Sequence, residues 1–277
     1  MPMTTLQPFQ AAVPTAFNDD ESLNVDATIA HIQYLAHHGI RSVLVSGATG
    51  EQHSLTLAEK QALAVAVNNA SFPDDLEIIF GVASIQQREA VALATTVAAQ
   101  PRISGILLGL PPYILPTQQE AANYVRAIMA AAQRPTILAN DPHRTGFNLE
   151  LTTLRQLVRS PQVVGLKEAG DPERVPAIRQ LMGNDWPIYT GNETDLRHRL
   201  ALGYNHLSSI SANLYSEDMH TWFDHLRTGT QGPDDLMIRR LAAIHSGSTL
   251  TFVKARITAQ EGTPMGQPRT PLGNFAE

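Results

Sequence analysis

The chain has 277 residues, of which 43% are hydrophobic, with 18 glycines and 18 prolines. This length and composition are typical of a globular α/β barrel with one large core. The chain has no cysteine, which excludes disulfides, thiolate metal sites and a cysteine nucleophile. Its net charge of −6 is spread along the chain without charge blocks, which disfavours nucleic acid as a partner and favours small molecules.

Neither export nor membrane insertion is indicated by the sequence. The segment Met1–Pro14 lacks a basic stretch followed by an apolar run. No stretch of about 18 consecutive apolar residues occurs anywhere in the chain. We therefore expect a soluble protein of the cytoplasm.

Eight short runs rich in Val, Ile and Leu alternate with longer amphipathic stretches, which is typical of repeated βα units in a parallel sheet. Several runs are apolar on both faces, as strands covered by helices are. Eight such units predict one (β/α)8 barrel, a TIM barrel of the α/β class, over residues 1–230. The predicted strands are Ala12–Pro14, Ser42–Ser46, Glu77–Val82, Gly105–Leu108, Thr136–Ala139, Val163–Lys167, Ile188–Thr190 and Leu207–Ile210.

The stretches between the strands carry apolar residues at three- and four-residue spacing and predict the outer helices. Thr56 stands three residues before Glu59, and Thr117 stands three before Glu120, which is the sequence of a capping box. The first four predicted helices are Asp26–His37, Leu57–Asn69, Gln86–Ala99 and Thr117–Ala132.

More residues follow the eighth strand than one helix needs, and Pro233 and Gly247 divide them. We expect two further helices, Asp234–His245 and Leu250–Gln260, in a C-terminal helical appendage over residues 231–277. The residues after Gly262 are expected to form a flexible tail.

The sixth predicted strand carries Lys167 in an otherwise apolar run, near the end of a parallel barrel where active sites lie. Burial there lowers the pKa of the amine, and a neutral amine can attack a ketone. The other two lysines, Lys60 and Lys254, lie on predicted helices, where a solvated lysine is the usual case. Lys167 is therefore the favoured nucleophile, and the alternative is a charge that snorkels at the barrel rim.

Three other strands end in polar groups at the same mouth. The second is followed by Gly47-Ala48-Thr49-Gly50-Glu51, whose amides and hydroxyl suit a carboxylate, a plain structural turn being the alternative. The fifth is followed by Arg144, which grips a carboxylate or forms a surface salt bridge. The fourth is followed by Tyr113, whose hydroxyl transfers a proton or whose ring only packs.

Metal and cofactor signatures are absent from the sequence. Of ten histidines, none forms a His-x-x-x-His pair with acidic partners on one predicted helix, so zinc is not expected. No nucleotide or flavin motif occurs either, and we expect an enzyme without a cofactor.

In this order and spacing, the motifs resemble the dihydrodipicolinate synthase and N-acetylneuraminate lyase family of class I aldolases. The resemblance implies a TIM barrel in which a lysine captures pyruvate as a Schiff base for reaction with an aldehyde. It runs from about Pro14 to the segment Arg269–Leu272 and is carried by Gly47–Glu51 with Leu55, Pro112-Tyr113 with Pro116, Asn140–Gly146, Gly165–Ala169 and Tyr189–Glu193.

The resemblance also implies roles for individual residues. Lys167 is similar to the Schiff-base lysine, and Thr49 with the amides around it to the site of the pyruvyl carboxylate. Glu51 would support that loop. Tyr113 corresponds to a tyrosine that enters the neighbouring subunit's active site, which implies a homo-oligomer, usually a tetramer built as a dimer of dimers. Arg144 is similar to the arginine that receives the carboxylate of aspartate semialdehyde.

Ala48, Gly191 and Ser208, at strand ends, are expected to contact substrate as well. Two positions depart from the family's pattern. The acid–base tyrosine that opens the strand-five motif is Ala139 here, and the serine or threonine that links two tyrosines into a proton relay is Ala48. Since general acid–base help is worth about 10²–10⁴ in rate, either another group substitutes or the chemistry has changed.

The substitute is, as a hypothesis, His143, His53 or a water held by Asp141. All three residues lie in loops at the predicted rim, and histidine titrates in a suitable range. The alternative for each is a polar loop residue that faces water.

Three functions remain open at this point. The first is a synthase that joins pyruvate to aspartate semialdehyde in lysine and diaminopimelate biosynthesis, which Arg144 favours. The second is a lyase for N-acetylneuraminate or a keto-deoxy sugar acid, which fits the altered relay. The third is a paralogue that binds a 2-oxo acid with little catalysis, which Ala48 and Ala139 favour.

Overall fold

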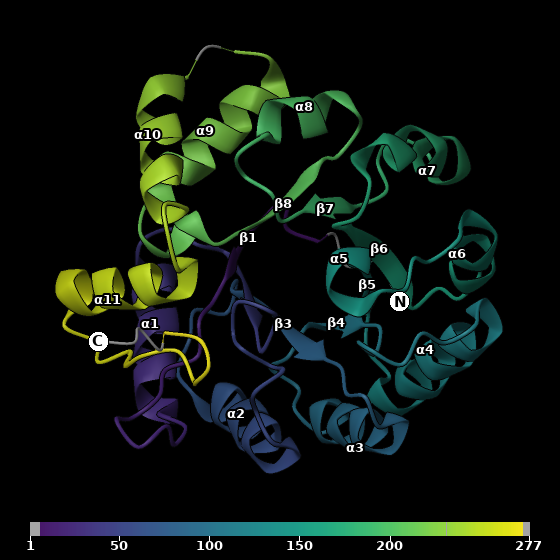
Figure 1. Ribbon diagram of the computed structural model, residues 1–277, viewed down its shortest axis with the longest axis horizontal. Helices are drawn as coiled ribbons and strands as arrows, with labels where there is room; N and C mark the ends of the chain where they lie inside the picture. Colours follow the sequence, from purple (N-terminus) through teal and green to yellow (C-terminus); the bar gives the residue numbers. More distant parts are fainter. Residues whose placement is uncertain (1–5, 231, 274–277) are drawn as a thin grey trace.

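The computed structural model describes residues 6–230 and 232–273. Within them, eight parallel strands are hydrogen-bonded in chain order, and β1 pairs with β8 to close the barrel. Helices surround the strands in Figure 1, and the predicted TIM barrel is confirmed. The strands are β1 Phe9–Ala12, β2 Ser42–Val45, β3 Glu77–Val82, β4 Gly105–Gly109, β5 Thr136–Asn140, β6 Val163–Glu168, β7 Ile188–Thr190 and β8 His206–Ser209.

The helices of the described residues alternate with the strands, and none of them is long and apolar enough to cross a membrane. Short 3₁₀ turns, η1 at Pro172–Arg174 and η2 at Ser211–Asn213, precede α7 and α9. The helices are α1 Val25–His37, α2 Leu57–Asn69, α3 Gln87–Ala98, α4 Gln118–Ala132, α5 Pro142–Thr145, α6 Leu151–Leu157, α7 Val175–Met182, α8 Leu196–Ala201, α9 Ser216–Thr228, α10 Asp234–Ile244 and α11 Thr249–Glu261.

Both predicted capping boxes are present. The Thr56 hydroxyl accepts from the Glu59 amide at 3.2 Å, and the Glu59 carboxylate accepts from the Thr56 amide at 2.8 Å. Thr117 and Glu120 make the same reciprocal pair at the start of α4. Local sequence alone therefore decides where these two helices begin.

The prediction for the first strand was wrong. We expected Ala12–Pro14, whereas β1 runs from Phe9 to Ala12. The strand contains Gln10, which interrupts the apolar run that would have marked it. In the folded barrel the Gln10 amide is buried and donates to the Ser42 hydroxyl at 3.3 Å, so a polar residue is accommodated inside.

Apolar side chains form two layers around the strands. The larger layer lies between the strands and the helices. A smaller layer fills the barrel interior, so the barrel is a packed core that opens only at its mouth. The inner layer consists of Leu6, Ala12, Leu44, Ile79, Leu107, Ile137 and Tyr189.

The two C-terminal helices are confirmed within one residue at each end, and α11 lies beside α1 in Figure 1. The expected flexible tail was wrong, because Met265 is fully buried and joins Val253 and Ile257 of α11 in an apolar cluster. The boundary between barrel and appendage at residue 230 stays a prediction. Residues 231 and 274–277 of the appendage lie outside the described residues.

Candidate active site

Lys167 lies in β6 near the barrel mouth, between Ala139 of β5 and Tyr189 of β7. Its amine donates to the Ser208 hydroxyl on β8 at 3.3 Å. Burial, together with the nearby positive charge of Arg144, lowers the pKa of the amine to about 8, although Asp141 and Glu193 partly oppose the shift. About a tenth of this amine is therefore neutral at pH 7, and the neutral amine is the form that acts as a nucleophile.

The space around the amine is bounded by residues with small side chains. A Cβ added at Gly191 would lie 3.0 Å from Lys167 Cε and 3.3 Å from its Nζ. On the other side, Gly109 of β4 is the register partner of Ala139, and Ala139 is the register partner of Lys167. The structure thus brings the predicted residues Gly191, Ser208 and Lys167 together, with the small side chain of Ala139 beside Lys167 on strand five.

The loop from Ser46 to Thr56, which joins β2 to α2, turns sharply at the mouth. Ser46 and Glu51 both have a φ of +54°, in the left-handed region. Gly81 of β3 is required for this turn, because a Cβ there would lie 1.9 Å from the Ser46 carbonyl oxygen. The Thr15 hydroxyl donates to the Gly50 carbonyl at 2.6 Å and ties the loop to the end of β1.

Ala48 and Thr49 lie at the exposed side of this loop, and each is half-buried. Among the described residues, the Thr49 hydroxyl has no hydrogen-bond partner, so it is available to a ligand. The carboxylate of Glu51, two residues further on, is fully buried and ion-paired to Lys254 of α11. The expectation that Lys60 and Lys254 are solvated was wrong, because both are buried.

The strand-five turn presents charged groups to the mouth. The short helix α5 ends at Thr145 and is capped by Gly146, whose φ of +71° suits a glycine. The Arg144 side chain is 66% exposed, and its Nε lies 3.2 Å from the Asp141 carboxylate. His143 is exposed beside it. Arg144 therefore makes the surface salt bridge that was the alternative at this position, while its charge still acts on Lys167.

The remaining two predicted residues, His53 and Tyr113, lie on different loops. His53, in the β2–α2 loop, keeps part of its side chain exposed, and partial desolvation of the ring lowers its pKa, an effect that Glu51 opposes and Arg144 reinforces. Tyr113 follows β4 and is 89% exposed with a φ of +74°. In the isolated chain the Tyr113 ring thus faces solvent, on a loop whose next two residues, Ile114 and Leu115, are also exposed.

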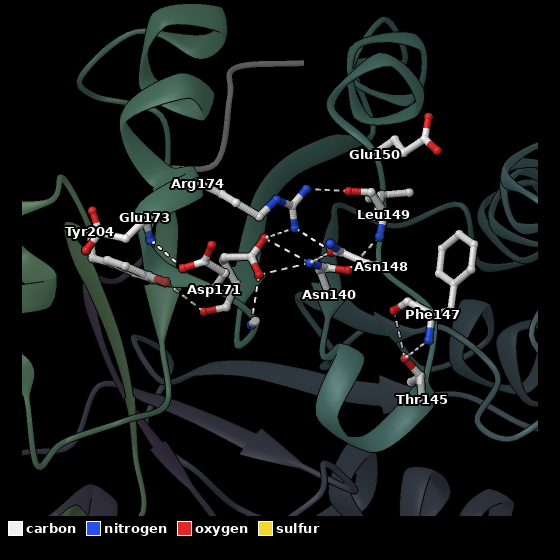
Figure 2. Close-up of polar contacts among 12 residues, drawn as sticks. Asn140, Thr145, Phe147, Asn148, Leu149, Glu150, Asp171, Glu173, Arg174 and Tyr204 are labelled. Carbon is white, nitrogen blue, oxygen red and sulfur yellow. Dashed lines mark hydrogen bonds and ion pairs between the residues drawn. The ribbon is translucent and has the colours of Figure 1, made fainter.

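A buried polar network at the ends of β5 and β6 was not predicted. Glu168, next to Lys167, is fully buried and accepts from the Asn140 amide at 2.8 Å and from Arg174 at 3.1 Å. Figure 2 shows Asn148 bound to both Asn140 and Arg174 in the same cluster. Because Asn140 and Glu168 are register partners, this network locks the strand pair that carries Ala139 and Lys167.

Glu193 is a second buried carboxylate that sequence reasoning left without a role. It accepts from the Ser211 hydroxyl at 2.6 Å and from the Ser209 hydroxyl. Burial raises its pKa, and these hydrogen bonds oppose that rise. The signal for both carboxylates was a glutamate close to the end of a strand, Glu168 as the last residue of β6 and Glu193 three residues after β7, but their partners lie on other strands and loops.

The chain is similar to known proteins over nearly its whole length. A family model described as the Dihydrodipicolinate synthetase family matches residues 6–277. The chain is 30% identical to a 4-hydroxy-tetrahydrodipicolinate synthase of Acaryochloris marina over 276 residues, which cover 98% of this chain and 93% of that protein.

Solved structures are similar over the same span. A dihydrodipicolinate synthase from Cyanidioschyzon merolae with lysine bound has a TM-score of 0.83 at 26% identity, covering 97% of this chain and 92% of that one. A sialic acid aldolase of Ruminococcus gnavus has a TM-score of 0.86 at 18% identity, covering 97% and 91%, and shows the likeness of the fold. The match of the family model over nearly the whole chain establishes that this protein belongs to the dihydrodipicolinate synthetase family.

Proposed function

We propose that this protein is a class I aldolase-type lyase in which Lys167 forms a Schiff base with pyruvate. The observation that carries the proposal is a lysine amine, with its pKa lowered to about 8, that lies among small residues at the barrel mouth. The neutral amine attacks the ketone carbon of pyruvate, and loss of water leaves an imine. Removal of a proton from the methyl carbon then gives an enamine, which adds to the carbonyl carbon of an aldehyde.

Thr49 and the amides around it are the proposed site of the pyruvyl carboxylate, together with Ala48. This assignment is supported by the free Thr49 hydroxyl and by the rigid left-handed turns on either side of it. Arg144 is the proposed site of a second carboxylate, that of the aldehyde partner, because its guanidinium is exposed at the mouth and its charge reaches Lys167.

A carboxylate on the aldehyde makes aspartate semialdehyde the leading partner. The proposed reaction is that of a 4-hydroxy-tetrahydrodipicolinate synthase, the activity named for the Acaryochloris marina relative. A sugar-acid lyase is the second candidate. The observation in its favour is that two small residues, Ala139 and Gly109, follow one another beside Lys167 in the strand register, where a larger side chain would obstruct a longer aldehyde.

Proton transfer needs a group other than the missing phenol. We assign it to His53, His143 or a water held by Asp141, which lie on the loops around Arg144. Replacing His143 or His53 with alanine should lower turnover about 10²-fold for the residue that acts and leave it unchanged for the other. If neither replacement alters turnover, the water at Asp141 remains, and Asp141→Asn tests it.

The central experiment is to mix the protein with pyruvate and borohydride and to measure the intact mass. The wild type should gain one reduced pyruvyl group, located on Lys167 by peptide mapping, and Lys167→Arg should gain none. Lys60→Arg is the matched control, since Lys60 is a second buried lysine whose amine donates to the Ala83 carbonyl. The absence of any adduct in the wild type would overturn the proposal.

Turnover with added aldehydes then separates the candidate functions. Aspartate semialdehyde and sugar-derived aldehydes distinguish the synthase from the sugar-acid lyase. An adduct without turnover on either class would identify a protein that binds a 2-oxo acid with little catalysis.

We also propose a homo-oligomer, built as a dimer of dimers, with the Tyr113 loop at an interface. The exposed run of Tyr113, Ile114 and Leu115 supports this, because such a cluster of large apolar side chains is unusual on a free surface. Sedimentation analysis of the wild type and of Tyr113→Ala tests the assembly. A monomeric wild type would contradict it.

A further inference from the structure

The carboxylate of Glu51 joins the mouth of the barrel to the C-terminal segment of the chain. Its Oε1 accepts from the Lys254 amine at 2.7 Å, and its Oε2 accepts from the backbone amide of Arg269 at 2.9 Å. Both side chains of this ion pair are 0% exposed. Both oxygens of a residue in the proposed carboxylate loop are thus held by residues more than two hundred positions away in sequence.

Arg269 also holds the far end of the same loop. Its Nη1 donates to the Ser54 carbonyl at 2.7 Å and to the Glu59 carboxylate at 3.0 Å. Glu59 belongs to the capping box of α2, so the guanidinium links the loop to the start of that helix. The loop is therefore fixed at Glu51 and at Ser54 by one segment of the chain.

The aromatic ring of Phe17, just after β1, packs against both cations. Lys254 Nζ lies 4.3 Å and Arg269 Cζ 4.4 Å from the centre of this ring. Such cation–π contacts favour cations that have lost part of their hydration. Phe17 also receives the backbone of the tail, because its amide donates to the Met265 carbonyl at 3.1 Å.

Helix α11 brings Lys254 to this place and makes a second buried polar contact, with α1. Glu261 at the end of α11 lies 2.9 Å from His31 Nδ1 on α1, and both side chains are almost completely buried. The other ring nitrogen of His31 lies 3.0 Å from Asn213 Oδ1. These two polar contacts act together with the buried apolar side chains of Val253 and Ile257 to hold the helix in position.

Glu51 is only two residues from Thr49 in the chain, so the contacts of Glu51 affect the loop at the barrel mouth. Within the loop, the Glu51 amide donates to the Ala48 carbonyl at 3.1 Å, and the Gln52 amide donates to the Gly47 carbonyl at 3.2 Å. These bonds make the turn one compact unit. Any shift of the Glu51 carboxylate is therefore passed to the Thr49 hydroxyl and to the amides beside it.

We propose that Lys254 and Arg269 are positioning residues for the 2-oxo acid, because they hold the carboxylate-binding loop in place through Glu51. The inference rests on the proposed function for the identity of the ligand. The C-terminal segment is thereby part of the active site's framework, although none of its residues is proposed to touch substrate. A displacement of about 1 Å in a positioning group can lower rate or affinity by up to about a hundredfold.

The test compares Lys254→Met with Lys60→Met, a matched removal of a buried lysine that does not contact Glu51. Hydrogen exchange of the amides of residues 47–54 reports the loop directly. The dependence of borohydride trapping on pyruvate concentration reports carboxylate binding. For Lys254→Met we expect faster loop exchange and a half-saturating pyruvate concentration about tenfold higher, with a nearly unchanged trapping rate at saturation. Lys60→Met should leave both readouts unchanged.

If Lys254→Met fails to fold, Glu51→Gln and Arg269→Ala test the same link between the C-terminal segment and the loop. Lys254→Arg should restore part of the pyruvate affinity, which a loss of general stability would not predict. Unchanged loop exchange in the folded variants would overturn the proposal, and so would faster exchange with unchanged half-saturation. A wild type that forms no adduct would instead overturn the proposed function, while the exchange data would still decide whether the C-terminal segment holds the loop.

Discussion

Ala139 and Lys167 are register partners on the adjacent strands β5 and β6, so a methyl group stands directly beside the residue that carries the proposed nucleophile. A methyl group has no atom that can donate or accept a proton, so Ala139 cannot serve as a general acid or base. The neighbouring network of Asn140 and Glu168 nevertheless holds the two strands in the geometry that an active site of this kind requires.

Restoring a phenol beside Lys167 should raise activity. In Ala139→Tyr, the hydroxyl would again be available for proton transfer, so we expect turnover with pyruvate and an aldehyde to rise about a hundredfold. Steady-state kinetics measure the change. Ala139→Phe adds the same ring without the hydroxyl, and an equal gain in that variant would show that filling space, and not proton transfer, was responsible.

The rate of adduct formation should depend on pH through the Lys167 amine. Since its pKa is lowered to about 8, only about a tenth of the amine is neutral at pH 7. The trapping rate at low pyruvate should therefore rise about tenfold per pH unit below pH 8 and level off above it. A rate independent of pH between about 6 and 8 would exclude this amine as the titrating group.

The charges around the amine should move this profile in opposite directions. Arg144 lowers the pKa of Lys167 and Asp141 raises it. Arg144→Met should therefore shift the profile to higher pH, and Asp141→Asn should shift it to lower pH. Shifts of the same sign in the two variants would contradict the arrangement.

Gly191 should be required for access to the amine. The Cβ in Gly191→Ala would lie 3.0 Å from Lys167 Cε, so the side chain must move away from its present position. We expect the trapping rate to fall at least about tenfold while the protein stays folded. Gly247→Ala is the control, because its Cβ meets nothing within 4 Å, and a full trapping rate in Gly191→Ala would contradict the assigned space.

The buried network at Glu168 should be costly to disrupt. Arg174→Met removes a cation from a carboxylate that is 1% exposed, and we expect the free energy of unfolding to fall by about 3–5 kcal/mol. Urea denaturation measures this change. Arg197→Met breaks an exposed pair with Asp234 and should cost less than about 1 kcal/mol, so similar losses in both variants would refute the special role of burial.

Local patterns in the sequence determined the architecture and pointed to Lys167 as the proposed nucleophile. Alternation of apolar runs with amphipathic stretches predicts eight βα units, since strand and helix periods are properties of neighbouring residues. The capping boxes at Thr56 and Thr117 depend on contacts three residues apart. Lys167 was recognisable because a lysine within an apolar strand is rare.

Only the tertiary structure decided which distant groups share the site and which of them are buried. Lys254 has the sequence surroundings of a solvated helical lysine, yet it pairs with Glu51 inside the protein. Met265 and Arg269 lie in a segment without a periodic pattern, yet they pack against the rest of the chain. Burial and ion pairing depend on which surfaces meet when the barrel closes, and that information is spread over residues hundreds of positions apart.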